Sequence, residues 1–217
     1  MSRSFLKKPQ FWLIIAIVLC LISMVGASLV QTSGGTVKVE NLRIVTQEGV
    51  VVTGQIYIPR GATPKNPLPL IVCQHGSFNN FQMQDLNMVE LSRRGFVVIS
   101  SDAYRHGSSS TYASDSFGNM TAIIDYARAS MNFIQKDNIG VTGHSMGGMI
   151  ALATLIQYEN LEAKGQGKSP ITAILEVGFD PVSTIPIPVF KSQLEKYPTL
   201  DLRNSLTGLV PGVMVRE

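Results

Sequence analysis

Apolar and polar residues form two kinds of pattern along the chain, and together these patterns predict strands that alternate with helices. Short apolar runs rich in valine and isoleucine, bounded by glycine or proline, are typical of buried strands. Runs of this kind lie at 37–45, 50–58, 70–73, 96–101, 139–142 and 171–177. Apolar residues at three- and four-residue spacing predict helices at 82–94, 120–134 and 146–158, the first of them capped by Gly95. Such alternation implies right-handed crossovers and a mainly parallel α/β sheet.

The first apolar run differs from the others because it is much longer. Residues 11–30 contain no charged side chain, and twenty such residues are about the length that crosses a bilayer. Arg3, Lys7 and Lys8 precede the run and favour a cytoplasmic N-terminus, with everything after residue 30 outside the cell. The sequence therefore predicts a single-pass membrane helix at 11–30 behind a cytoplasmic tail at 1–10.

A cleaved signal peptide is the alternative for this segment. Val25-Gly26-Ala27 loosely resembles a cleavage site, but the apolar length exceeds what a signal peptide requires and favours an uncleaved anchor. Under either interpretation the rest of the chain lies outside the cell, and it is secreted if the signal is cleaved. Residues 31–35, QTSGG, predict a flexible linker between this segment and a folded domain.

Composition narrows the classes of partner. The 217 residues are 45% hydrophobic and only 15% charged, a low charged share that the long apolar run largely explains. The formal net charge is +3, and no basic stripe with interleaved aromatic residues follows residue 30, so no nucleic-acid partner is expected. The two cysteines, Cys20 and Cys73, lie in separate apolar segments and do not predict a disulfide framework.

A serine lies between glycines at the junction of a predicted strand and a predicted helix. Residues 138–155 read NIGVTGHSMGGMIALATL, and the stretch from Gly143 to Gly147 matches the G-x-S-x-G nucleophile elbow. In such an elbow a strained turn holds the hydroxyl of the serine, here Ser145, above the edge of the sheet. The pattern indicates nucleophilic catalysis.

Three segments resemble the α/β-hydrolase superfamily in their order and spacing: LIVCQHGS, GFVVISSDAYRHGSSS and GVTGHSMGG. The resemblance covers about residues 37–180 and is greatest to esterase, serine-aminopeptidase and prolyl-oligopeptidase-like members. It implies a fold built on an α/β-hydrolase sheet. It also implies an enzyme that cleaves a small ester or an amide (peptide) substrate through an acyl-serine intermediate. It implies no metal and no organic cofactor.

The resemblance also implies which residues carry the reaction. Ser145 would be the nucleophile, and the backbone N–H of Met146 would be one donor of the oxyanion hole. The N–H of Ser77 would be the second donor, with that of Phe78 as the alternative. Asp180, just past the strand at 171–177, is a candidate for the catalytic acid; the alternative is a simple Asp-Pro turn.

Other motif residues would shape the site. The glycines would leave room for the tight turn and for close packing of the helix. His75 and His144 would shape the loop that carries the oxyanion donor and the elbow. His106 would have a structural or substrate-lining role. The residues with these supporting roles are Gly76, Gly143, Gly147, Gly148, His75 and His144.

One part of the expected site is missing, because no histidine follows His144. In the family the histidine comes last in chain order, after the acid. Residues 181–217 are too few for the last two strands and resemble the start of a cap. We therefore expect a partial α/β-hydrolase domain at 36–217, truncated at its C-terminal end, with no strand beside 171–177. The rival interpretation is a non-catalytic surface domain of the same fold that binds or scaffolds.

Overall fold

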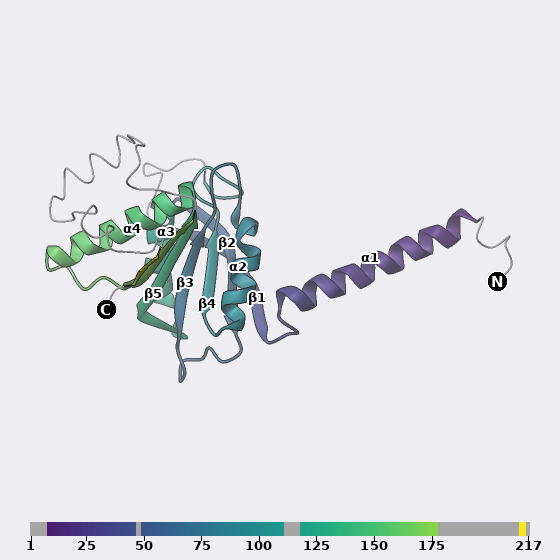
Figure 1. The fold of residues 1–217 in the computed structure, drawn as a ribbon, viewed down its shortest axis with the longest axis horizontal. Helices are drawn as coiled ribbons and strands as arrows, with labels where there is room; N and C mark the ends of the chain where they lie inside the picture. The colour runs from purple at the N-terminus through teal and green to yellow at the C-terminus, as the bar shows by residue number, and fades with distance from the viewer. Residues whose placement is uncertain (1–7, 47–48, 111–117, 178–212, 216–217) are drawn as a thin grey trace.

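A single mixed sheet forms the body of the protein in the computed structural model, which describes residues 8–46, 49–110, 118–177 and 213–215 (Figure 1). The strands lie in the order β1-β2-β4-β3-β5-β6-β7. Their bounds are β1 Val37–Val45, β2 Val51–Pro59, β3 Leu68–Gln74, β4 Val97–Ser101, β5 Ile134–His144, β6 Ile171–Val177 and β7 Val213–Val215.

The centre of this sheet is parallel, as the alternation of strands and helices predicts. β4, β3, β5 and β6 pair in parallel, whereas β1, β2 and β7 join at the two sides in antiparallel pairs. The carboxyl ends of the parallel strands therefore meet at one edge. In open α/β sheets this edge is where ligands bind.

Helices cover both faces of the sheet. The short 3-10 helix η2 (Phe81–Gln84) and α2 (Asp85–Arg93) lie on one face, and α3 (Asn119–Ser130) and α4 (Met146–Ala163) lie on the other (Figure 1). Successive strand residues point to opposite faces, so Val72 of β3 belongs to the large core under α3 and α4 while Cys73 belongs to the small core under α2. Strands buried on both faces explain the wholly apolar runs in the sequence.

The end of α2 confirms the predicted glycine cap. Gly95 has φ +93°, and its N–H donates to the carbonyl of Ser92 at 3.1 Å. The N–H of Phe96 donates to the carbonyl of Leu91 at 3.3 Å. These two bonds form a Schellman motif, which satisfies carbonyl groups that the helix end leaves free.

The predicted helix at 120–134 is wrong at its C-terminal end. α3 ends at Ser130, Met131 is extended, and Ile134 begins β5, where it pairs with Leu68 of β3. Met131 and Ile134 are both buried, so their helical spacing reflects the core rather than a continuing helix.

The expected absence of a strand beside β6 is also wrong, because β7 pairs with β6 over Ala173–Leu175. Three residues are too short a run to be recognised as a strand from sequence.

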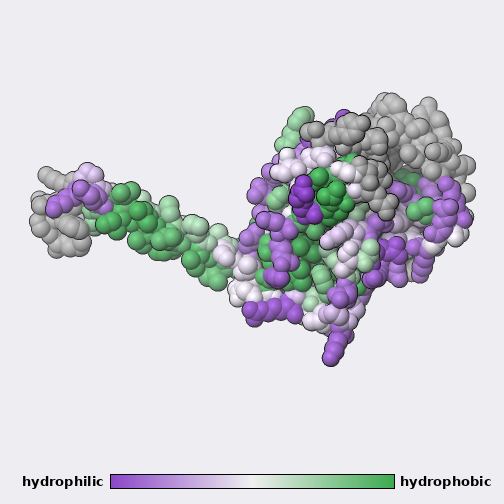
Figure 2. All heavy atoms as spheres, turned by 180° about the vertical axis from the view of Figure 1, so that it is seen from behind, coloured by the Kyte–Doolittle hydropathy of each residue, from purple (hydrophilic) through white to green (hydrophobic). Residues whose placement is uncertain are grey.

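The long apolar segment forms one helix, α1 (Pro9–Gln31), which projects away from the body (Figure 1). Figure 2 shows its surface as a continuous hydrophobic stretch, and none of its residues is buried. By length and composition it is the one helix in the described part of the chain that could cross a membrane.

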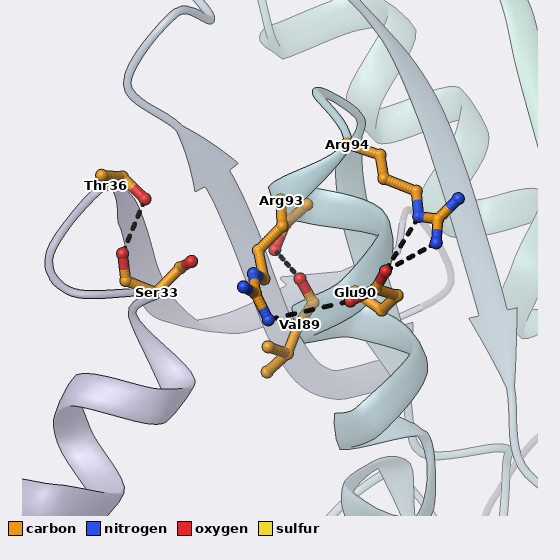
Figure 3. Close-up of polar contacts among 7 residues, drawn as sticks. Ser33, Thr36, Val89, Glu90, Arg93 and Arg94 are labelled. Carbon is orange, nitrogen blue, oxygen red and sulfur yellow. Dashed lines mark hydrogen bonds and ion pairs between the residues drawn. The ribbon is translucent and has the colours of Figure 1, made fainter.

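A short hydrogen-bonded turn joins α1 to β1. Thr32 accepts the N–H of Val37 at 2.9 Å, and the Nε2 group of Gln31 donates to the hydroxyl of Tyr57 at 2.9 Å. Within this turn the hydroxyl of Thr36 donates to the carbonyl of Ser33, and at the end of α2, a helix that α1 contacts, Glu90 pairs with Arg93 and Arg94 (Figure 3). The predicted linker segment is thus an ordered turn against the body.

Candidate active site

The turn between β5 and α4 holds Ser145 in a strained backbone conformation. Ser145 has φ +53° and ψ −116°, in a region that few residues other than glycine adopt. His144 ends β5 and Met146 begins α4, so the turn consists of a single residue. The strand-to-helix elbow that the G-x-S-x-G pattern predicts is present.

Two glycines allow this turn because backbone atoms fill the space beside them. A Cβ atom on Gly143 would lie 2.1 Å from the carbonyl oxygen of Gly147. A Cβ atom on Gly147 would lie 2.2 Å from the carbonyl oxygen of Gln74, at the end of β3. Any larger residue would push the strands and the helix apart. The glycines therefore fix the first turn of α4 against β5 and β3.

The first turn of α4 offers N–H groups next to Ser145. The N–H of Gly148 donates to the carbonyl of Ser145 at 2.9 Å. Met146 is the first residue of the helix, and its N–H has no acceptor among the residues that the structure describes. Free N–H groups at a helix N-terminus carry partial positive charge and favour a negative oxygen nearby.

The loop after β3, residues 75–80, packs against this elbow; we call it the oxyanion loop. A Cβ atom on Gly76 would lie 2.9 Å from Nδ1 of His144 and 3.5 Å from Cβ of Ser145. Ser77 and Phe78 follow in exposed positions, and Phe78 has φ +62°. Within the described ranges no atom accepts the N–H of Ser77 or of Phe78. The oxyanion loop thus brings unused donors close to Ser145.

His75 has a structural role that its hydrogen bonds define. The ring is fully buried, its Nε2 accepts the N–H of Ala103 at 3.0 Å, and its Nδ1 lies 2.7 Å from the carbonyl of Gly76. Because Nε2 accepts, we assign the ring proton to Nδ1, which donates to Gly76. Burial lowers the pKa of His75 below its usual value. Neither nitrogen has a lone pair left for Ser145, so His75 cannot act as its base.

Among the described residues, the other two histidines are not hydrogen-bonded to the hydroxyl of Ser145 either. Nδ1 of His106 lies 3.0 Å from the carbonyl of Tyr104, and its ring centroid lies 5.2 Å from that of His75. Nδ1 of His144 is buried and has no hydrogen-bond partner in the part of the chain that the structure describes. The hydroxyl of Ser145 has no hydrogen-bond partner among the described residues. That part of the chain therefore presents a nucleophile and donors without a base.

Two further expectations concern the catalytic acid with the cap, and metal binding. Asp180 and the predicted cap residues 181–212 lie outside the described residues. For metals, the described ranges contain no group of three or more histidine, cysteine, aspartate or glutamate residues that could hold an ion.

Asp102 is a buried residue near the candidate site that the motifs alone did not indicate. It follows β4 directly, is 1% exposed, and its carboxylate accepts hydrogen bonds from three different segments. The available signal was an acidic residue placed immediately after a strand of fully buried residues. Buried carboxylates at such positions need several donors and rarely occur without a specific role.

Comparison with known proteins places this architecture among characterised folds. A family model described as the alpha/beta hydrolase fold matches residues 69–173. A search of curated proteins gave no match.

Two solved structures resemble the chain at 20% sequence identity. One is a bacterial heroin esterase, with a TM-score of 0.52 over 70% of this chain and 48% of that protein. The other is EstE1, a thermophilic carboxylesterase cloned from a metagenomic library, with a TM-score of 0.51 over 73% of this chain and 58% of that protein. At this identity the likeness concerns the fold alone. The chain spans about half the length of these relatives.

Proposed function

We propose that this chain, which has the α/β-hydrolase fold, carries the nucleophilic half of a serine hydrolase that cleaves an ester or an amide. One observation supports this most strongly. Ser145 occupies a positive-φ elbow at the carboxyl edge of the sheet, with Gly76 of the oxyanion loop packed against it. Strained backbone conformations cluster at functional sites, and in a nucleophile elbow the strain exposes the serine hydroxyl.

The proposed reaction is acyl transfer to water. The hydroxyl oxygen of Ser145 attacks the substrate carbonyl carbon while a base takes the hydroxyl proton. The carbonyl oxygen becomes an oxyanion between the N–H groups of Met146 and Ser77, with Phe78 as the alternative to Ser77. Collapse expels the alcohol or amine, which takes up that proton. Water then releases the acid from Ser145.

The base is the component that the described residues do not supply. His75 is excluded by its two hydrogen bonds, and no described residue is hydrogen-bonded to the Ser145 hydroxyl. In comparable enzymes, loss of a triad member leaves about three to four powers of ten of catalysis over water, contributed by the oxyanion hole and binding. We expect the 217-residue chain alone to hydrolyse esters feebly.

Hydrolysis of an activated ester tests this function. The chain alone is compared with the chain extended by whatever its gene encodes beyond Glu217, each with and without Ser145→Ala. We expect strong, Ser145-dependent turnover only where a histidine is added, and a small effect of Ser145→Ala in the chain alone. Strong Ser145-dependent turnover by the chain alone would contradict this and indicate His106 as an unexpected base.

The rival function is a non-catalytic domain that binds or scaffolds at the cell surface. The observation that favours it is that the hydroxyl of Ser145 has no hydrogen-bond partner among the described residues. If the gene encodes no further histidine, and if Ser145→Ala leaves ester hydrolysis unchanged in every form, the catalytic proposal fails and the binding role takes its place.

The proposed location is the cell membrane, with the domain outside. The exposed apolar surface of α1, behind Arg3, Lys7 and Lys8, supports insertion with the N-terminus inside. The ordered turn after α1 and the bond between Gln31 and Tyr57 would then hold the body close to the bilayer. The alternative is cleavage of the segment and secretion.

A further inference from the structure

Asp102 connects three segments that are far apart in the sequence. Its Oδ1 accepts the N–H of Phe81 at 3.0 Å, and its Oδ2 accepts the hydroxyl of Thr53 at 2.8 Å and the N–H of Ser108 at 2.9 Å. The side chain is buried, and none of the ion pairs among the described residues includes it. Within the described ranges, neutral donors alone therefore hold this carboxylate.

These contacts place Asp102 at one end of the oxyanion loop. Phe81 is the first residue of η2 and follows directly after residues 75–80. At the other end of the oxyanion loop, Nε2 of His75 accepts the N–H of Ala103, the residue after Asp102. Two successive residues behind β4 thus hold both ends of the oxyanion loop.

We propose that Asp102 is a positioning residue, which acts through Phe81 to fix the oxyanion loop so that its free N–H groups face the oxyanion formed at Ser145. The inference rests on the proposed function of Ser145 and adds a residue to it. Asp102 does not touch the substrate. Its effect depends on the length and direction of one backbone hydrogen bond.

A carboxylate suits this position better than any other side chain. The three described groups that bond to the Asp102 carboxylate are all donors, and a carboxylate offers only acceptors. In Asp102→Asn an amide N–H₂ would oppose an N–H or O–H group, which leaves a buried donor without a partner. Space is also limited, because a Cβ atom on Gly107 would lie 2.1 Å from Oδ2. A longer side chain at position 102 would have to displace this loop.

Phe81 allows the single hydrogen bond to be removed with a matched control. Phe81→Pro deletes the N–H that donates to Asp102, and proline is tolerated at the first position of a helix. Asn80 is extended, with φ −138° and ψ 179°, as a residue before proline requires. Phe81→Ala removes the same ring but keeps the N–H. The two variants differ in the bond between Phe81 and Asp102.

Binding of phenylboronic acid to the full-length chain tests the proposal without need for a catalytic base. The boron atom accepts the oxygen of Ser145, whose hydroxyl proton passes to the buffer, and becomes a tetrahedral anion with one of its oxygens in the oxyanion hole. We expect Phe81→Pro and Asp102→Asn each to weaken binding by at least about tenfold, because the loss of one oxyanion donor costs two to three powers of ten in rate. We expect Phe81→Ala to bind like the unmodified chain.

Two further variants separate positioning from loss of stability. Tyr158→Phe removes a half-buried hydrogen bond of 2.6 Å to Asp125, between α3 and α4, and should lower the unfolding temperature without weakening the boronate. Equal binding by Phe81→Pro and Phe81→Ala would overturn the role of Asp102. Unchanged binding by Ser145→Ala would instead overturn the proposed function, and the inference with it.

Discussion

The imidazole of His75 accepts the backbone N–H of Ala103 at 3.0 Å and so joins the oxyanion loop after β3 to the loop after β4. The two residues are 28 positions apart in the chain. Because the bond needs an unprotonated Nε2, the arrangement requires a neutral ring. The folded protein therefore resists protonation of His75.

This relationship predicts how stability depends on pH. Burial lowers the pKa of His75 in the folded state, so below about pH 6.5 the unfolded chain binds a proton that the folded chain excludes. Stability contributed by the neutral ring is present above that pH and is lost as the pH falls. For one group the slope is at most about 1.4 kcal/mol per pH unit.

Urea unfolding between pH 5 and pH 7.5 measures this slope, with His75→Asn as the comparison. We expect the variant to be less stable at neutral pH and to lose less stability on acidification. Both proteins keep His106 and His144, so the comparison concerns His75. Parallel pH profiles would contradict the assigned role of His75.

Gly147→Ala should destabilise the protein, whereas Gly140→Ala should not. A Cβ atom at position 147 would lie 2.2 Å from backbone, while one at position 140 would lie 3.4 Å from the Cγ1 atom of Ile71. Overpacking of this kind costs about 1–3 kcal/mol or more. Chemical unfolding of both variants measures the difference. Equal stability of the two would mean that the elbow is looser than the structure shows.

Cys73 should resist thiol reagents in the folded protein. Burial raises the pKa of its thiol to about 12, and only the thiolate reacts. In a Cys20→Ser background, iodoacetamide at pH 8 should label Cys73 slowly until urea unfolds the chain. Fast labelling without urea would show that the small core opens under native conditions.

A charge in the middle of α1 should impair membrane insertion more than a charge at its end. Leu19→Arg places a cation near the middle of the helix, at a cost of about 2.5–3.5 kcal/mol, whereas Leu29→Arg lies close enough to the end to reach the interface. Leu19 and Leu29 are similarly exposed, at 57% and 55%, so the substitutions differ mainly in depth. Carbonate extraction of membranes measures the retained fraction.

The same experiment separates an anchor from a signal peptide. An anchor keeps the unmodified protein in the membrane pellet with its N-terminal residues intact. Recovery of the protein from the medium with its N-terminus at Ser28 would overturn the anchor and favour cleavage.

Local patterns in the sequence determined the elements and the nucleophile. The apolar runs predicted six of the strands. Burial on both faces selects valine and isoleucine at successive positions of a central strand such as β4, whereas the edge strand β1 combines buried and exposed residues. The glycines around Ser145 predicted the elbow because a positive-φ turn leaves no room for larger neighbours. Each of these requirements is met within a few residues, so each produces a local sequence pattern that can be recognised before the fold is known.

Only the tertiary structure decided how the site is held together. The bond between Phe81 and Asp102 spans 21 residues, and that between Thr53 and Asp102 spans 49. Neither residue type nor spacing predicts them, because they exist only when β2, β4 and β3 lie side by side. For the same reason the sequence could not predict three other features. These are the position of the ring proton on His75, the end of α3 at Ser130 and the pairing of β7 with β6. Hydrogen-bond partners that are distant in sequence are selected by the order of the strands.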